Sequence, residues 1–200
     1  MQGVQASSLL LPLLRSPFQG ELLAWLYLHP DAEYSLIELA RRLGVSHATA
    51  SREADRLAAA GLVLERRLGN VRLIRANQAT VVARPLTDLL AVTYGPMAIM
   101  DELLAPVAGV DRAYIYGSWA ARYRGEPGPV PGDLDVLIVG TADPDDVYEA
   151  ARAAEHRLGR EVNARIVSPA AWSGATTDPF LTSVRSRPLV ELDLTRPRAA

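Results

Sequence analysis

The sequence predicts an α+β chain of two parts, in which helices and a β-hairpin precede a small α/β unit with a mixed sheet. Three observations support this fold class. Capped helical patterns fill residues 18–60, alternating residues then flank Gly69-Asn70, and strand and helix patterns alternate from residue 113 onwards. We expect three segments along the chain: 1–78, a helical linker or dimerisation segment at 79–105, and 106–200.

The amino-acid composition excludes several kinds of functional site. The 200 residues carry a net charge of −2 and contain no cysteine, which excludes disulfides, zinc–thiolate sites and cysteine nucleophiles. All 21 basic residues are arginines, so no lysine chemistry is available. No apolar run approaches the length of a membrane span, and the N-terminal apolar patch lacks the basic region of a signal peptide. We therefore expect a cytoplasmic protein without a membrane partner.

Two helices joined by a tight turn are predicted early in the chain. Ser35 and Glu38 have the spacing of a capping box, and the helix that they begin ends before Gly44. Ser46 caps the next helix, which runs to about Ala60 before Gly61. A helix, a tight turn with glycine and a second helix form the arrangement that reads DNA.

Two strands at 62–65 and 71–75 complete this part as a winged helix-turn-helix. The residues LIELARRLGVSHATASREADRLAAAGLV, with the hairpin after them, resemble the winged-helix regulators of the ArsR and MarR type. The resemblance implies a double-stranded DNA partner, with the second helix of the motif in the major groove. Proteins with this motif commonly bind DNA as dimers, so we expect a homodimer.

The resemblance also assigns the contacts with DNA. Residues expected to face the bases are Ser46, His47, Thr49, Ala50, Ser51 and Arg52. Residues expected to touch phosphate, backbone or minor groove are Arg56, Arg66, Arg67, Asn70 and Arg72. Residues 39–78 contain eight arginines against three acidic residues, a local charge of +5 in an acidic chain. Such a basic patch favours nucleic acid, although a solvated helix face or a protein-binding module is the alternative.

The segment between the two parts carries two helical patterns. One follows Pro85 and the other begins at Pro96. Two interpretations stay open here, a connector packed on the second part and a dimer interface.

The second part opens with a motif for metal and phosphate. An apolar strand at 113–116 ends at Gly117-Ser118, and Asp133 and Asp135 open the next apolar strand. Residues i and i+2 of a strand point to the same face, so the two carboxylates lie together and can hold a divalent metal with its phosphates. The alternative is a solvated strand entrance, because turn-rich loops often end in aspartate.

The Gly-Ser turn followed by Asp-Leu-Asp resembles the polymerase-beta-type nucleotidyltransferases, and most closely their minimal branch, over roughly residues 105–170. The resemblance implies a nucleotidyltransferase-like α/β domain. Its Gly117-Ser118 turn would cradle the triphosphate of a nucleoside triphosphate, and Asp133 and Asp135 would bind Mg²⁺ as metal ligands and catalytic groups. Arg122 or Arg124 could clamp the triphosphate.

Two departures from that family bear on catalysis. Fourteen residues separate Ser118 from Asp133, which is a longer loop than the family usually has. The family's third carboxylate falls at Asn163, which cannot accept a proton, and Glu161 is the alternative carboxylate on the same face of the strand. A magnesium-dependent nucleotidyltransferase activity therefore stays undecided from the sequence.

Three functions follow. The first is a DNA-binding transcriptional regulator whose second domain binds a magnesium nucleotide as sensor or substrate, and the sequence favours it. The second is an active nucleotidyltransferase, acting on a protein, an RNA or a small molecule in the manner of an antitoxin, that also binds DNA. The third is a DNA-binding repressor with a structural relic attached.

Overall fold

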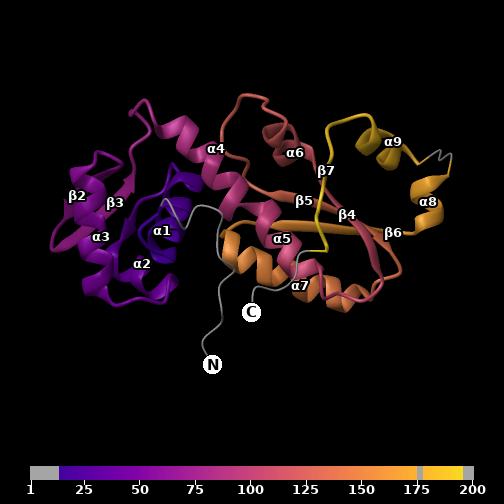
Figure 1. Cartoon of the computed structure of the whole chain (residues 1–200), viewed down its shortest axis with the longest axis horizontal. Coiled ribbons are helices and arrows are strands. Elements are labelled where there is room, and N and C mark those ends of the chain that lie inside the picture. Colours follow the sequence, from indigo (N-terminus) through magenta and orange to yellow (C-terminus); the bar gives the residue numbers. More distant parts are fainter. Residues whose placement is uncertain (1–13, 175–177, 196–200) are drawn as a thin grey trace. The chain divides into compact units, whose positions relative to one another are not determined.

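The computed structural model describes residues 14–174 and 178–195 (Figure 1). These residues group into two compact units that divide between Gly95 and Pro96. The predicted linker segment 79–105 is shared between the units, because its first helix belongs to one and its second helix to the other. No helix within the described ranges is long and apolar enough to cross a membrane.

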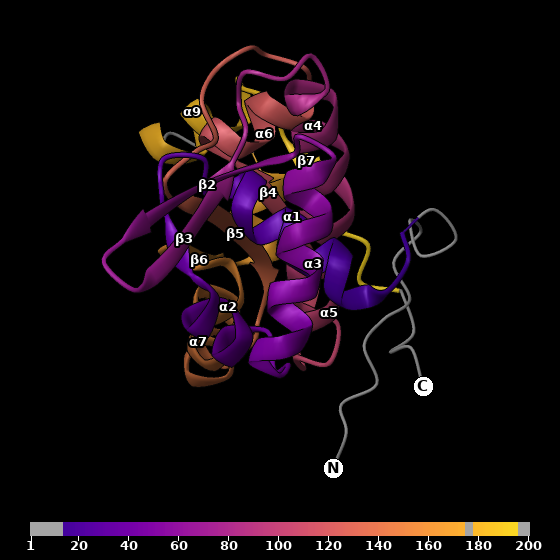
Figure 2. The same cartoon turned by 90° about the vertical axis from the view of Figure 1, so that its left-hand side faces the viewer.

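The first unit combines helices with a three-stranded antiparallel sheet of strand order β1-β3-β2. Figure 2 shows its hairpin of β2 and β3 beside α3. Helix α1 packs against α4, and α2 packs against α3. Leu22, Leu26 and Tyr27 of α1 are fully buried, and the Tyr27 hydroxyl donates to the carbonyl of Leu62 at 2.8 Å. The elements are α1 (Pro17–Leu28), β1 (Tyr34–Ser35), α2 (Leu36–Arg42), α3 (His47–Ala59), β2 (Val63–Leu68), β3 (Val71–Ala76) and α4 (Ala83–Tyr94).

The predicted helix ends in this unit are confirmed. The Ser35 hydroxyl accepts from the amide of Glu38 at 3.2 Å, and the Glu38 carboxylate accepts from the amide of Ser35 at 2.8 Å, which completes the capping box. Gly44 has a φ of +66° between α2 and α3, the left-handed conformation that glycine adopts without strain. Ser46 caps α3 by accepting from the amide of Thr49 at 3.1 Å.

The wing is a tight hairpin between β2 and β3. Leu68 pairs with Val71, so the loop is the dipeptide Gly69-Asn70. Gly69 has a φ of +60°, and no residue other than glycine has a positive φ in the part of the chain that the structure describes. This pattern is that of a type II′ turn, whose twist matches that of the flanking strands. It explains why the order Gly-Asn closes this hairpin.

The second unit is built on the predicted mixed sheet, with strand order β6-β5-β4-β7. Strand β5 runs parallel to β6 and antiparallel to β4, and the two residues of β7 pair with β4. The elements are α5 (Pro96–Leu104), β4 (Val110–Tyr116), α6 (Gly117–Tyr123), β5 (Leu134–Gly140), α7 (Pro144–Leu158), β6 (Val162–Val167), α8 (Pro169–Ser173), α9 (Pro179–Arg185) and β7 (Val190–Glu191).

Helices cover both faces of this sheet. Helices α5 and α7 pack together along one side of it (Figure 1). On the opposite face, Tyr114 and Leu137 form a buried cluster with Leu181 and Val184 of α9, and Trp172 of α8 packs against it. This second face continues along the strands to the row in which Tyr116, Asp135 and Asn163 are neighbours.

Candidate functional site

Helix α3 presents one face to the core and another to solvent. Ala50, Ala54 and Leu57 are buried at helical spacing. The prediction that Ala50 faces the bases is therefore wrong, because its spacing of four and seven residues from Ala54 and Leu57 places it on the buried face of the helix. Ser46, His47 and Arg52 are exposed, whereas Thr49 and Ser51 are half-buried.

The two hydroxyls at the start of α3 already have partners. The hydroxyl groups of Ser46 and Thr49 lie 2.9 Å apart, and the Ser46 hydroxyl also accepts from the Thr49 amide. These contacts fix the first turn of the helix, and they leave His47 and Arg52 as its larger exposed polar side chains near that end. Because DNA-reading helices use their N-terminal residues, this end is the candidate nucleic-acid contact.

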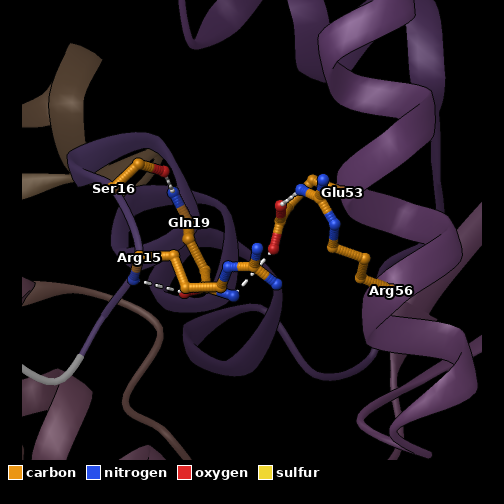
Figure 3. Close-up of polar contacts among 5 residues, drawn as sticks. All are labelled: Arg15, Ser16, Gln19, Glu53 and Arg56. Carbon is orange, nitrogen blue, oxygen red and sulfur yellow. Dashed lines mark hydrogen bonds and ion pairs between the residues drawn. The ribbon is translucent and has the colours of Figure 1, made fainter.

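A buried carboxylate fixes α3 against α1. Glu53 is 4% exposed and accepts from the side-chain amide of Gln19 on α1 at 2.7 Å (Figure 3). Gln19 is itself held, because its side-chain oxygen accepts from the backbone amide of Arg15 and its backbone amide donates to the Ser16 hydroxyl. The second oxygen of Glu53 pairs with Arg56 at 2.9 Å. The site predicted from the sequence omits Glu53, although its spacing from Ala50 and Leu57 places it on the buried face.

The predicted wing arginines differ in their surroundings. Arg66 pairs with Glu33 at 2.5 Å, and this hydrogen bond lowers the pKa of the Glu33 carboxyl. Arg72 pairs with Glu65 on the facing strand and with Asp55 of α3 at 2.6 Å. Arg72 therefore joins the wing to α3 as well as being a predicted DNA contact.

Two predicted contacts remain available to an external anion. Arg52 on α3 and Arg67 on β2 are exposed, and neither pairs with a carboxylate among the described residues. Arg56 is half exposed beside Glu53. Asn70 is exposed in the hairpin loop.

The second candidate site lies at the start of β5. The register places Asp135 between Tyr116 of β4 and Asn163 of β6. The side-chain nitrogen of Asn163 lies 3.5 Å from Oδ2 of Asp133 and 3.5 Å from Oδ1 of Asp135. The two aspartates and the residue expected at the third position are thus brought together.

This environment disfavours a charge on Asp135. Burial raises the pKa of the Asp135 carboxyl, the neighbouring Asp133 raises it further, and the hydrogen bond from Asn163 opposes the rise. Within the part of the chain that the structure describes, the two carboxylates have one neutral amide between them and no cationic side chain paired with either. A bound cation would supply the positive partner.

Gly117 makes this arrangement possible. Its φ is +70°, and a Cβ atom placed on it would lie 2.6 Å from Oδ2 of Asp135. The next residue, Ser118, is exposed. The backbone at the end of β4 therefore approaches the carboxylate more closely than any other residue type would permit.

The other two residues predicted to contact phosphate, Arg122 and Arg124, donate hydrogen bonds to backbone carbonyl groups. Arg122 donates to the carbonyl of Glu126 at 3.4 Å, and Arg124 donates to the carbonyl of Leu189 at 3.0 Å. Their expected role as triphosphate clamps stays a prediction.

The oxygen atoms of Asp133, Asp135 and Asn163 are suited to magnesium, although they do not include a third carboxylate. Mg²⁺ prefers oxygen ligands and keeps several waters, so two carboxylates and the amide oxygen of Asn163 form a sufficient protein contribution. Which end of the Asn163 amide faces the carboxylates is assigned from hydrogen bonding, and a metal would draw the oxygen inward. Among the described residues no group of three acids or histidines could hold a metal, so Glu161 does not complete a carboxylate triad.

Comparison with known families gives a match within the first part of the chain. Residues 13–70 match the MarR family model, a stretch that begins before α1 and ends in the hairpin loop. The match shows that this region is similar to the MarR family, which supports a winged helix-turn-helix and suggests a DNA-binding transcriptional regulator. It does not extend into the second unit. No curated protein and no solved structure matched the chain.

Proposed function

We propose that this protein is a transcriptional regulator that binds DNA through α3 and the wing, and that its second unit binds a magnesium-bound nucleotide. The observation that carries the DNA-binding part is the exposed N-terminal end of α3 within the region that matches the MarR family. The local charge of residues 39–78 supports it, because phosphate contacts supply much of the affinity for DNA.

Within this proposal the arginines divide into two roles. Arg52 on α3 reads base edges in the major groove, where a guanidinium can donate two hydrogen bonds to guanine. Arg67 on the wing contacts phosphate, which positions the protein without reading sequence. Arg72 and Asp55 hold the wing against α3 so that the two contacts keep a fixed spacing.

We also propose that the protein binds its operator as a homodimer. Leu89 and Val92 lie near the same side of α4 and are 44% and 47% exposed, and Val82 just before the helix is 44% exposed. Apolar surface of this kind is suited to an interface between copies. A two-fold dimer would place two copies of α3 on half-sites about 34 Å apart, one turn of DNA.

The DNA-binding proposal is tested with a duplex selected from random sequence for binding to the wild-type protein. We expect Arg52→Ala to weaken binding to this duplex by about 1–3 kcal/mol with little effect on mixed-sequence DNA. Arg67→Ala should weaken both duplexes and lower the slope of log K against log salt by about 0.9. Fluorescence anisotropy at several salt concentrations measures both effects.

Arg84→Ala is the matched control, because Arg84 is an exposed arginine on α4, outside the predicted contacts. Equal losses from Arg52→Ala and Arg84→Ala would contradict the assigned reading face. The selected sequences test the dimer as well. An inverted repeat supports it, and a single half-site contradicts it.

The nucleotide-binding part rests on the contacts of the Asn163 side chain with Asp133 and Asp135. When bound, magnesium would neutralise the phosphates that it carries. The resemblance to nucleotidyltransferases implies that the phosphates would lie at the Gly117-Ser118 turn. Because Asn163 stands beside Asp135 and cannot accept a proton, we propose binding of the nucleotide as a signal, with nucleotidyl transfer as the alternative.

Titration calorimetry of ATP, GTP, CTP and UTP, with and without magnesium, tests this site. We expect at least one nucleotide to bind only with magnesium, and Asp135→Asn to abolish that binding. Affinity should also fall as the pH falls through the raised pKa of Asp135, because the protonated carboxyl no longer binds the metal.

The same variant should make the metal-free protein more stable. A raised carboxyl pKa means that the folded state disfavours the charged form of Asp135. The charged carboxylate therefore lowers the free energy of unfolding near neutral pH. This destabilisation disappears as the pH falls below the pKa that the carboxyl has in the unfolded state. Asp135→Asn should therefore raise Tm at pH 7 and do so less in acid. Asp111→Asn, at an exposed acid on β4, is the control.

Wild-type protein that binds none of the four nucleotides would contradict the nucleotide-binding proposal. The proposal of a DNA-binding regulator would then stand without it.

A further inference from the structure

Asp133 and Asp135, called here the acidic pair, share one face of the sheet with Arg165. Among the described residues this arginine stacks on an aromatic ring and forms no ion pair with a carboxylate. Arg165 follows Asn163 by two residues on β6, so both side chains leave the same face of the sheet. The two positions are about 6.6 Å apart along the strand. The guanidinium carbon of Arg165 lies 3.8 Å from the ring centroid of Phe180 on α9.

An aromatic pair connects this arginine to the acidic pair. Phe180 meets Tyr116 edge to face, with ring centroids 5.8 Å apart, and Tyr116 is paired in register with Asp135. Burial raises the pKa of the Tyr116 hydroxyl, the Asp135 charge raises it further, and the Arg165 charge lowers it. Tyr116 is therefore within electrostatic reach of both charges. The acids and the cation border the same stretch of the sheet.

Other arginines of this unit have internal partners. Arg112 also lies over an aromatic ring, that of Tyr114 at 5.1 Å, but it forms a two-point ion pair with Glu191 at 2.7 and 3.0 Å. Arg122 and Arg124 donate to backbone carbonyls. Arg165 is exposed, and its stacking on Phe180 restricts the guanidinium while leaving its five donors available.

Charge balance points to a polyanionic ligand beside the metal. Two aspartates neutralise one Mg²⁺, so the phosphates of a nucleotide bring negative charge that the metal and the acids do not offset. A planar guanidinium matches phosphate oxygens with two parallel hydrogen bonds.

We propose that Arg165 binds the terminal phosphates of a nucleoside polyphosphate whose magnesium lies on Asp133 and Asp135. The inference rests on the nucleotide-binding function proposed above and adds to it the residue that contacts the phosphate chain. A nucleoside triphosphate binds through its phosphate chain, and a nucleoside without phosphates does not use Arg165. Free inorganic polyphosphate shares this chemistry, so the test includes both sources.

Calorimetry of the full chain with magnesium, using the tightest of the four triphosphates, its nucleoside and inorganic tripolyphosphate, tests this assignment. Arg165→Gln should weaken the triphosphate by about 10- to 100-fold, the range for a charge-assisted contact. Arg165→Lys should restore part of the affinity because it keeps the charge and loses the planar fork. Binding of tripolyphosphate as tight as the triphosphate would assign the site to inorganic polyphosphate, and much weaker binding assigns it to the nucleotide.

Arg112→Gln is the matched control, because it removes an arginine that also lies over an aromatic ring, that of Tyr114, yet is ion-paired. It should leave nucleotide affinity unchanged, and the Tm of each variant reports whether the unit is folded. An Arg165→Gln protein that keeps wild-type affinity overturns the role of Arg165 while the nucleotide-binding function stands. A wild-type protein that binds neither the triphosphates nor tripolyphosphate overturns both.

Discussion

Replacing Gly117 by alanine is expected to abolish magnesium-dependent nucleotide binding. At a φ of +70° an alanine costs about 1–2 kcal/mol of backbone strain. Its Cβ would also lie 2.6 Å from Oδ2 of Asp135, so the carboxylate must move away from the end of β4. Calorimetry with the tightest-binding nucleotide measures the loss, and thermal unfolding measures the strain.

Gly125→Ala separates these two effects. Gly125 also has a positive φ, of +88°, but a Cβ placed there meets no atom within 4 Å. It should therefore lower Tm by an amount similar to the strain at Gly117 and leave nucleotide affinity intact. If Gly117→Ala and Gly125→Ala bind nucleotide equally well, the close approach of Gly117 to Asp135 does not serve binding.

Replacing Glu53 by alanine is expected to destabilise the first unit and to weaken DNA binding through the position of α3. The change leaves the amide of Gln19 without its acceptor and removes the partner of Arg56. An unsatisfied buried polar group costs about 1–3 kcal/mol, and the removed side-chain volume adds to this. Native-state hydrogen exchange of the α1 and α3 amides measures the loss where it occurs.

Two further variants identify the cause of that loss. Asp55→Ala removes an exposed acid from the same helix, whose ion pair with Arg72 is worth about 0–1 kcal/mol. Glu53→Gln keeps an acceptor for Gln19 and removes the charge opposite Arg56, so its effect should lie between those of Glu53→Ala and Asp55→Ala. An equal, small loss in both alanine variants would show that Glu53 does not hold α3 in place.

The sequence predicted the features that neighbouring residues determine. The capping box of Ser35 and Glu38, the cap at Ser46 and the turn at Gly44 involve contacts within three or four residues. Backbone sterics and short hydrogen bonds decide such features, and they can be inferred from spacing alone. The mixed sheet followed from alternating strand and helix patterns, and the structure confirms it.

Contacts between distant residues needed the tertiary structure. The family resemblance already predicted that Asn163 joins the two aspartates, and the structure shows how, because α7 returns the chain to place β6 parallel to β5. Arg165 and Phe180 come from a strand and a later helix, and Gln19 and Glu53 are 34 residues apart. The sequence alone determined the helix caps and turns and the types of side chain that a site could contain. Which charges are paired, buried or left for a ligand was decided by packing, because the dielectric environment and the partner of each charge depend on residues far away in the chain.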